Sequence, residues 1–145
     1  MRALVDDVTH QLGVDGTGLV VLRGTDFVHH GVHGALTGDT VMPIASASKW
    51  LAVATVLTLV DEGKLDLDVP VARYVREFDR GDRRQVTLRQ CLACTAGFAA
   101  RPPANVRTLD MDGFAAAAAD GAFREQPGAA FRYTGVGFQV AAVAA

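Results

Sequence analysis

Apolar residues near the start of the chain recur with a helical period. Leu4, Val5, Val8 and Leu12 fall on one stripe, and Gly13 follows the last of them. A stripe of this kind covers one side of a core, and glycine is a common helix stop. The pattern therefore predicts an amphipathic helix that ends at Gly13.

The next segment predicts a β-hairpin. Residues 18–22 and 27–33 are the candidate strands, and Gly24-Thr25 between them suits a two-residue turn with glycine first. The second strand carries His29, His30 and His33, which invite a metal hypothesis. At about 3.3 Å per residue, the backbone positions of His29 and His33 in a strand lie about 13 Å apart. We therefore expect His29 and His33 not to share an ion, and all three histidines to be structural residues of the sheet.

A long apolar run follows Ser46 and Lys49. Residues 50–60 are apolar almost all round, which is typical of a buried helix, and Gly63 is its expected C-terminal stop. Pro43 lies just upstream. We therefore expect Ser46 to stand at or near the first turn of this helix.

The rest of the pattern is mainly helical. We expect the following elements: an extended connector over 64–70, a helical turn over 70–75, a solvated loop over 73–89, a short helix capped by Thr87, a helix through 115–119 capped by Asp110 or Asp112 and stopped by Gly121, extended chain over 129–133, and an apolar helix over 137–145.

Composition and charge exclude several function classes. Half of the residues are apolar and 21% are charged, which predicts a folded core. The net charge of −2 gives no indication of a nucleic-acid partner or an anionic membrane surface. No apolar run is long enough to span a membrane, and Asp6 and Asp7 interrupt any signal-peptide pattern. We expect a cytoplasmic protein without cofactor or metal, whose oligomeric state the sequence leaves open.

Ser46 and Lys49 are the strongest candidates for chemistry. The chain has two serines and two lysines, against twelve arginines, and one pair stands three residues apart. On a helix, residues three apart face the same way, so Lys49 can reach the Ser46 hydroxyl. A desolvated lysine of lowered pKa can take the serine proton, and the helix N-terminus favours a developing oxyanion. The alternative is a capping serine beside an ordinary first-turn lysine.

Cys91 and Cys94 form the chain's one C-x-x-C pair. A redox pair or half of a metal site has this spacing, but no second pair completes a zinc site and no strand is expected before it. We interpret the two cysteines as small buried residues on one helical face.

Four segments, in order, resemble one known family. They are PIASASK at 43–49, EGKLDLDVP at 62–70, VTLRQCLACTAG at 86–97 and QPGAAFRY at 126–133. Together they resemble the serine beta-lactamase-like family, which includes class C beta-lactamases, D-Ala-D-Ala carboxypeptidases and related esterases. The resemblance implies an α+β fold, in which an antiparallel sheet is flanked by helices and joined to a helical region.

The resemblance also implies roles for three residues. Ser46 corresponds to the acylated nucleophile, Lys49 to the lysine that helps to activate it, and Tyr133 to the tyrosine of a Y-x-N motif. From the residues alone, Tyr133 is equally compatible with a half-buried structural tyrosine.

The sequence departs from the family pattern at three points. Gly135 takes the place of the Y-x-N asparagine in the substrate-binding position, and Cys94 stands where relatives often carry histidine. The third family motif, Lys/His-Thr/Ser-Gly, does not occur after Tyr133. We therefore expect residues 1–145 to be the N-terminal part of one such domain, with an incomplete sheet because the late strands are missing.

Two functional hypotheses follow. The first is a serine hydrolase that forms an acyl-enzyme on Ser46, with an ester as the preferred substrate and a beta-lactam or D-Ala peptide as the second choice. The missing amide at Gly135 favours the ester. The second hypothesis is a catalytically incomplete fragment or binding module of the same fold, suggested by the apolar pattern that runs to Ala145.

Overall fold

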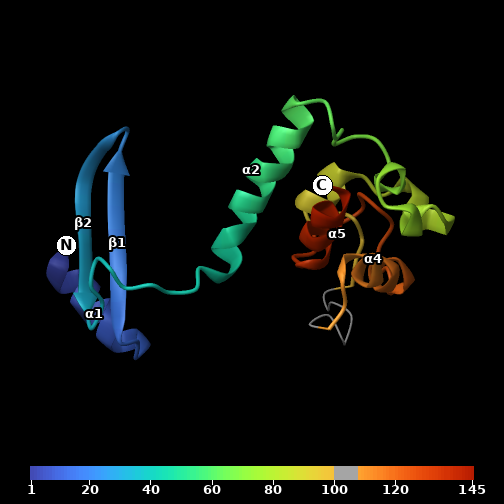
Figure 1. The fold of residues 1–145 in the computed structure, drawn as a ribbon. Helices are drawn as coiled ribbons and strands as arrows, with labels where there is room; N and C mark the ends of the chain where they lie inside the picture. Colours follow the sequence, from blue (N-terminus) through green and yellow to red (C-terminus); the bar gives the residue numbers. More distant parts are fainter. Residues whose placement is uncertain (100–107) are drawn as a thin grey trace. The chain divides into compact units, whose positions relative to one another are not determined.

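The computed structural model describes residues 1–99 and 108–145. Its contacts divide the chain into two compact units, Met1–Ile44 and Ala45–Ala145. The first unit combines one helix with a hairpin, and the second is helical (Figure 1). We describe each unit by itself.

The first unit contains α1 (Arg2–Leu12), β1 (Gly16–Arg23) and β2 (Asp26–Gly34). The helix and both strands expected from the sequence are confirmed. Gly13 ends α1 with a left-handed φ of 62°, and Gly24 opens the hairpin turn with a φ of 61°. Helix α1 lies on one face of the hairpin, where the Thr9 hydroxyl donates to Thr17 Oγ1 at 2.8 Å.

The side chains of His29 and His33 lie closer together than their backbone positions. The rings of His29 and His33 stack with their centroids 5.9 Å apart. Both side chains lie on the same strand face, and Gly31 between them has no side chain to hold them apart. The rings can therefore lean toward each other, although their backbone positions are four residues apart.

The second unit consists of helices and 3₁₀ turns. In chain order these are η1 (Ala45–Ala47), α2 (Ser48–Asp61), η2 (Val71–Arg73), η3 (Arg76–Phe78), η4 (Gly81–Gln85), α3 (Leu88–Leu92), α4 (Met111–Asp120) and α5 (Val136–Ala144). The expected caps are present: Thr87 and Gln90 form a capping box on α3, and the Asp110 side chain accepts from Gly113 N at the start of α4.

The helix over the long apolar run is present, but its predicted burial is wrong. In α2, Val56 is the one buried residue, whereas Trp50 is 65% exposed and Leu51 is 45% exposed. A sequence that is apolar all round does not show which side of the helix will be covered. The helix ends as expected, since Gly63 takes a left-handed φ of 70° just beyond it.

The expectation of a solvated loop over 73–89 is also wrong. Val75, Phe78 and Val86 from this segment are almost completely buried. The backbone folds into consecutive 3₁₀ turns, which bring these side chains inward, whereas the arginines of the segment are exposed except for the half-buried Arg83. The segment therefore forms part of the core.

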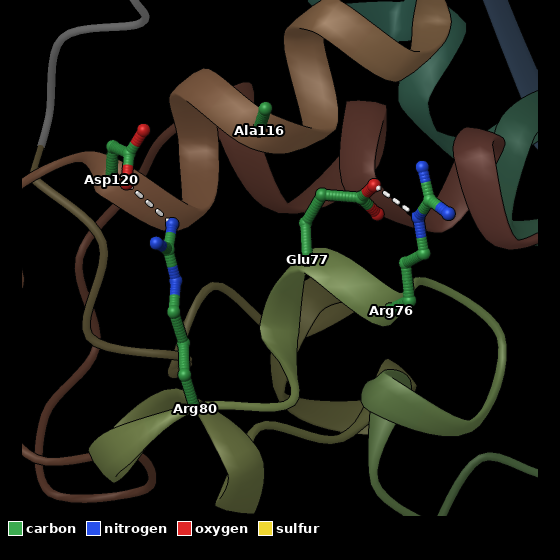
Figure 2. A pocket seen from close by; sticks show the side chains of 5 residues that line it. All are labelled: Arg76, Glu77, Arg80, Ala116 and Asp120. Atoms are coloured by element: carbon green, nitrogen blue, oxygen red, sulfur yellow. Dashed lines mark hydrogen bonds and ion pairs between the residues drawn. The ribbon is translucent and has the colours of Figure 1, made fainter.

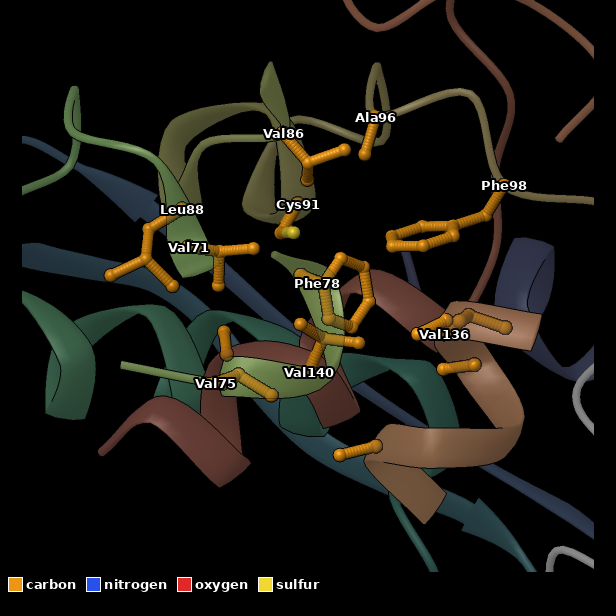
Figure 3. Close-up of a cluster of buried hydrophobic side chains, with 14 of the residues drawn as sticks. Val71, Val75, Phe78, Val86, Leu88, Cys91, Ala96, Phe98, Val136 and Val140 are labelled. Carbon is orange, nitrogen blue, oxygen red and sulfur yellow. The ribbon is translucent and has the colours of Figure 1, made fainter. Parts of the chain in front are cut away.

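The core of the second unit gathers side chains from nearly all of its elements (Figure 3). Phe78 and Phe98 meet edge to face, with centroids 6.0 Å apart. Val136 and Val140 bring α5 into the same cluster, which also contains Leu88 and Cys91 of α3. None of the helices in the described residues is both long and apolar enough to cross a membrane.

A glycine permits the closest helix contact in this core. A β-carbon at Gly137 of α5 would collide with the Cys91 carbonyl oxygen and stand 3.0 Å from Cys91 Cα. These are backbone atoms, so they cannot move aside as a side-chain end could. Gly137 therefore sets the distance between α3 and α5.

We predict that Gly137→Ala destabilises the protein. Inside a helix, replacing glycine by alanine raises the free energy of unfolding by about 1 kcal/mol. Overpacking against the fixed backbone lowers it by about 1–3 kcal/mol. The free energy of unfolding should therefore fall. Chemical denaturation measures this change. Gly135→Ala is the control, because a β-carbon there meets no heavy atom within 4 Å. Equal stability of both variants and wild type would contradict the prediction.

Candidate active site

Ser46 lies in a strained turn directly before the first long helix of its unit. It belongs to η1, and the preceding Ala45 has a φ of 44°, in the left-handed region that non-glycine residues avoid. The Ser48 hydroxyl donates to the Ala45 carbonyl at 2.7 Å and holds this turn. The turn presents Ser46 as an exposed side chain at the entrance of α2.

Lys49 stands beside Ser46, as their spacing predicts. Its Nζ donates to Ser46 Oγ at 2.9 Å. The same ammonium lies 5.1 Å from the ring centroid of Tyr133 and 5.6 Å from that of Phe138. Phe138 carries no motif that predicts this contact, and only its place in the first turn of α5 could have suggested it.

Tyr133 completes the group. It is 56% exposed, and its ring centroid lies 5.1 Å from Lys49 Nζ. Hydrogen bonding with the Ser46 hydroxyl, and then with Lys49, lowers the pKa of the Tyr133 phenol. The structure thus brings the three candidate side chains together around one hydroxyl, although Tyr133 is far from the other two in sequence.

The segment that carries Tyr133 is anchored to the turn after α3. The backbone N–H of Arg132 donates to the Cys94 carbonyl at 2.8 Å, and the Cys94 thiol donates to the Thr134 carbonyl at 3.7 Å. Arg132 also forms an ion pair with Glu125. Tyr133 is therefore exposed itself but lies between two fixed neighbours.

Cys94 has a positioning role that sequence reasoning missed. Its φ of 57° is left-handed, which turns the chain so that its carbonyl and thiol both face the Tyr133 segment. No sequence signal predicts this, because cysteine rarely adopts this conformation. The expected burial of both cysteines is confirmed. Burial raises the pKa of the Cys91 thiol strongly, which keeps it protonated and argues against a redox role.

Gly135 lies at the N-terminus of α5 and borders a hollow beside Lys49. Ser48, Lys49, Ala52, Gly135, Phe138, Gln139 and Ala142 line this hollow. The φ of Gly135 is −81°, and its missing side chain would meet no heavy atom within 4 Å. The position of the family asparagine is therefore open space next to the Ser46 group.

A second hollow, between η3 and α4, has a different character. Figure 2 shows that its charged side chains pair with one another: Arg76 Nε donates to Glu77 at 3.1 Å, and Arg80 pairs with Asp120. A hydrogen bond with its own backbone, followed by the one from Arg76, lowers the pKa of Glu77. These charges already satisfy one another, so this hollow offers no unpaired group for a substrate.

Comparison with known proteins shows which family the chain matches. A family model described as Beta-lactamase matches residues 1–145. Serine beta-lactamase-like protein LACTB, mitochondrial, of Bos taurus is 43% identical over 63 residues, which are 41% of this chain and 11% of that protein.

Two solved structures share the fold. A crystal structure of a putative beta-lactamase from Bacteroides dorei has a TM-score of 0.82 at 26% identity, covering 98% of this chain and 44% of that one. A crystal structure of a D-stereospecific amidohydrolase from Streptomyces sp. has a TM-score of 0.80 at 25% identity. The match covers 99% of this chain and 48% of that one. The resemblance and the α+β fold expected from the sequence are confirmed. The chain spans less than half the length of these solved relatives.

The Tyr133 contacts predict a measurable titration. Because hydrogen bonds from Ser46 and Lys49 favour the phenolate, Tyr133 should ionise below the ordinary tyrosine pKa, and phenolate should accumulate as pH rises through that lowered value. Ultraviolet difference absorbance of tyrosinate measures this, with Tyr133→Phe to assign the signal against Tyr74. Ser46→Ala should raise the pKa of Tyr133, and an unchanged titration in that variant would contradict the assignment.

Proposed function

The chain belongs to the beta-lactamase family, and on this basis we propose that it acts as a serine hydrolase through an acyl-enzyme on Ser46. The observation that carries the proposal is the hydrogen bond from Lys49 Nζ to Ser46 Oγ, with the Tyr133 ring centroid 5.1 Å from the same Nζ. Such a group has the parts of an activated nucleophile: an attacking oxygen, a proton acceptor and a fixed cation.

The direction of the hydrogen bonds suggests how the proton moves. Lys49 donates to Ser46 Oγ, so the serine hydrogen is free to point at the Tyr133 oxygen. As Ser46 Oγ bonds to the substrate carbonyl carbon, its proton passes to the Tyr133 phenolate. The phenol then protonates the leaving group as the carbonyl re-forms. Water repeats the sequence on the acyl-serine and releases the acid.

Two features favour the charges that develop on this path. The Lys49 ammonium lies next to the attacking oxygen, and the N-terminus of α2 directs its positive dipole end toward the same place. We assign the Ser46 N–H as one donor to the oxyanion of the tetrahedral intermediate.

A carboxylic ester is our first choice of substrate. The hollow beside Lys49 lacks a side-chain amide at Gly135, so it offers less to an amide-containing substrate than the family asparagine would. Beta-lactams and D-Ala peptides are the second choice, and the similarity to a D-stereospecific amidohydrolase keeps amides in consideration. The cytoplasmic location expected from the sequence stays a prediction.

Labelling with a fluorophosphonate tests the nucleophile. Intact mass should show one adduct, which Ser46→Ala should abolish together with ester turnover, by roughly 10³-fold or more. Ser48→Ala removes the chain's other serine and shows that the adduct is not on Ser48; it should keep the adduct but label more slowly, because the Ser48 hydroxyl holds the Ser46 turn. An adduct that persists in Ser46→Ala, or no adduct on folded protein, would overturn the proposal. The second of these outcomes would favour a non-catalytic binding module.

Gly135→Asn tests the substrate class. The backbone there suits asparagine and the space is open, so the variant should fold and present an amide beside Lys49. We expect penicillin acylation to rise relative to ester hydrolysis by about tenfold, which corresponds to one added hydrogen bond. Gly135→Ala separates the amide from the effect of added bulk. An unchanged ratio in Gly135→Asn would count against the ester preference drawn from this position.

A further inference from the structure

Two histidine rings in the first unit converge over a glycine. His29 and His33 lie on the α1-facing side of β2, with ring centroids 5.9 Å apart. A β-carbon built on Gly31 would stand 3.2 Å from His29 Nε2 and 3.5 Å from His33 Nε2, so both atoms border the space above this glycine. Leu19 pairs with Gly31 across the hairpin and places an apolar residue opposite the gap.

The two facing nitrogens lack the partners that buried polar atoms normally have. Nε2 of His29 and Nε2 of His33 are both buried, and neither has a hydrogen-bond partner among the described residues. The His33 side chain is only 3% exposed. A buried polar atom without a partner carries a desolvation cost that a ligand in this space would remove.

Asp6 prepares His33 to act as a ligand. The other ring nitrogen, Nδ1 of His33, lies 2.8 Å from the Asp6 carboxylate on α1. A carboxylate accepts a hydrogen bond, so this contact favours the tautomer with its proton on Nδ1 and a lone pair on Nε2. Metal-binding histidines in proteins are oriented by a carboxylate in the same way.

We propose that His29 and His33 form a binding site for one divalent transition-metal cation, such as Zn²⁺, Ni²⁺ or Cu²⁺, through their Nε2 atoms. Imidazole nitrogen is a preferred ligand of these ions, whereas Mg²⁺ and Ca²⁺ prefer oxygen. Two rings that share a tetrahedral zinc ion at about 2.0–2.1 Å have centroids about 5 Å apart. From the observed stacked arrangement, with centroids 5.9 Å apart and planes 27° apart, the rings must close by about 1 Å and turn their Nε2 atoms toward a common point.

The site has two protein ligands, with Asp6 in a positioning role. No group of three or more histidine, cysteine, aspartate or glutamate side chains suited to a metal occurs in the part of the chain that the structure describes. Water would fill the remaining coordination positions. The site lies in the unit Met1–Ile44, whereas Ser46, Lys49 and Tyr133 belong to the other unit. It shares no residue with the proposed hydrolase site.

Titration of the 145-residue chain with Zn²⁺, Ni²⁺ and Cu²⁺ chlorides, followed by calorimetry, tests the site. We expect saturable binding of one ion, and the Cu²⁺ complex should show coupling to two imidazole nitrogens in electron paramagnetic resonance. His29→Ala and His33→Gln should abolish this binding. Asp6→Asn should weaken it by roughly tenfold or more, because it removes the carboxylate that orients His33.

His30→Ala is the matched control, since His30 is exposed on the opposite face of the same strand. It should bind the ion as wild type does. Circular dichroism of each variant checks folding. If His33→Gln is unfolded, the loss of metal binding is judged from His29→Ala, because His29 is only half-buried. No saturable binding by folded wild type, or equal loss in His30→Ala, would overturn the proposal.

Discussion

The backbone of α5 lies directly against α3 at Gly137 and Cys91, and the candidate active site depends on this contact. Helix α5 begins three residues after Tyr133, and its Phe138 faces the Lys49 ammonium. The same helix therefore fixes the end of the tyrosine segment and borders the lysine of α2. The geometry around Ser46 therefore depends on the main-chain distance between α3 and α5. Gly137 sets this distance because it has no side chain.

Signals within a few residues of one another predicted much of this fold. The stop at Gly13, the cap at Thr87 and the cap at Asp110 are local hydrogen-bonding or backbone requirements, so the sequence displays them directly. The approach of Lys49 to Ser46 is equally local, because helix geometry places residues three apart side by side. Four ordered segments then indicated the family and, through it, Tyr133.

The features that were missed depend on tertiary packing. Successive 3₁₀ turns have no hydrophobic period, so Val75 and Phe78 looked like part of an arginine-rich loop although both are buried. The left-handed Cys94 has no local signal, and its use is visible only once its carbonyl meets Arg132. The strand spacing of His29 and His33 described their backbone correctly, but the gap at Gly31 decided where their rings went.

Ala45 connects the geometry of the site with its tolerance of sequence change. A non-glycine residue in the left-handed region carries about 1–2 kcal/mol of strain, and Ala45 is held there immediately before the candidate nucleophile. Glycine at this position would relieve the strain but give the Ser46 turn more freedom. A β-branched residue would increase the strain and favour a different turn. A β-branched or bulky side chain is therefore disfavoured at this position, although the residue itself takes no part in the proposed chemistry.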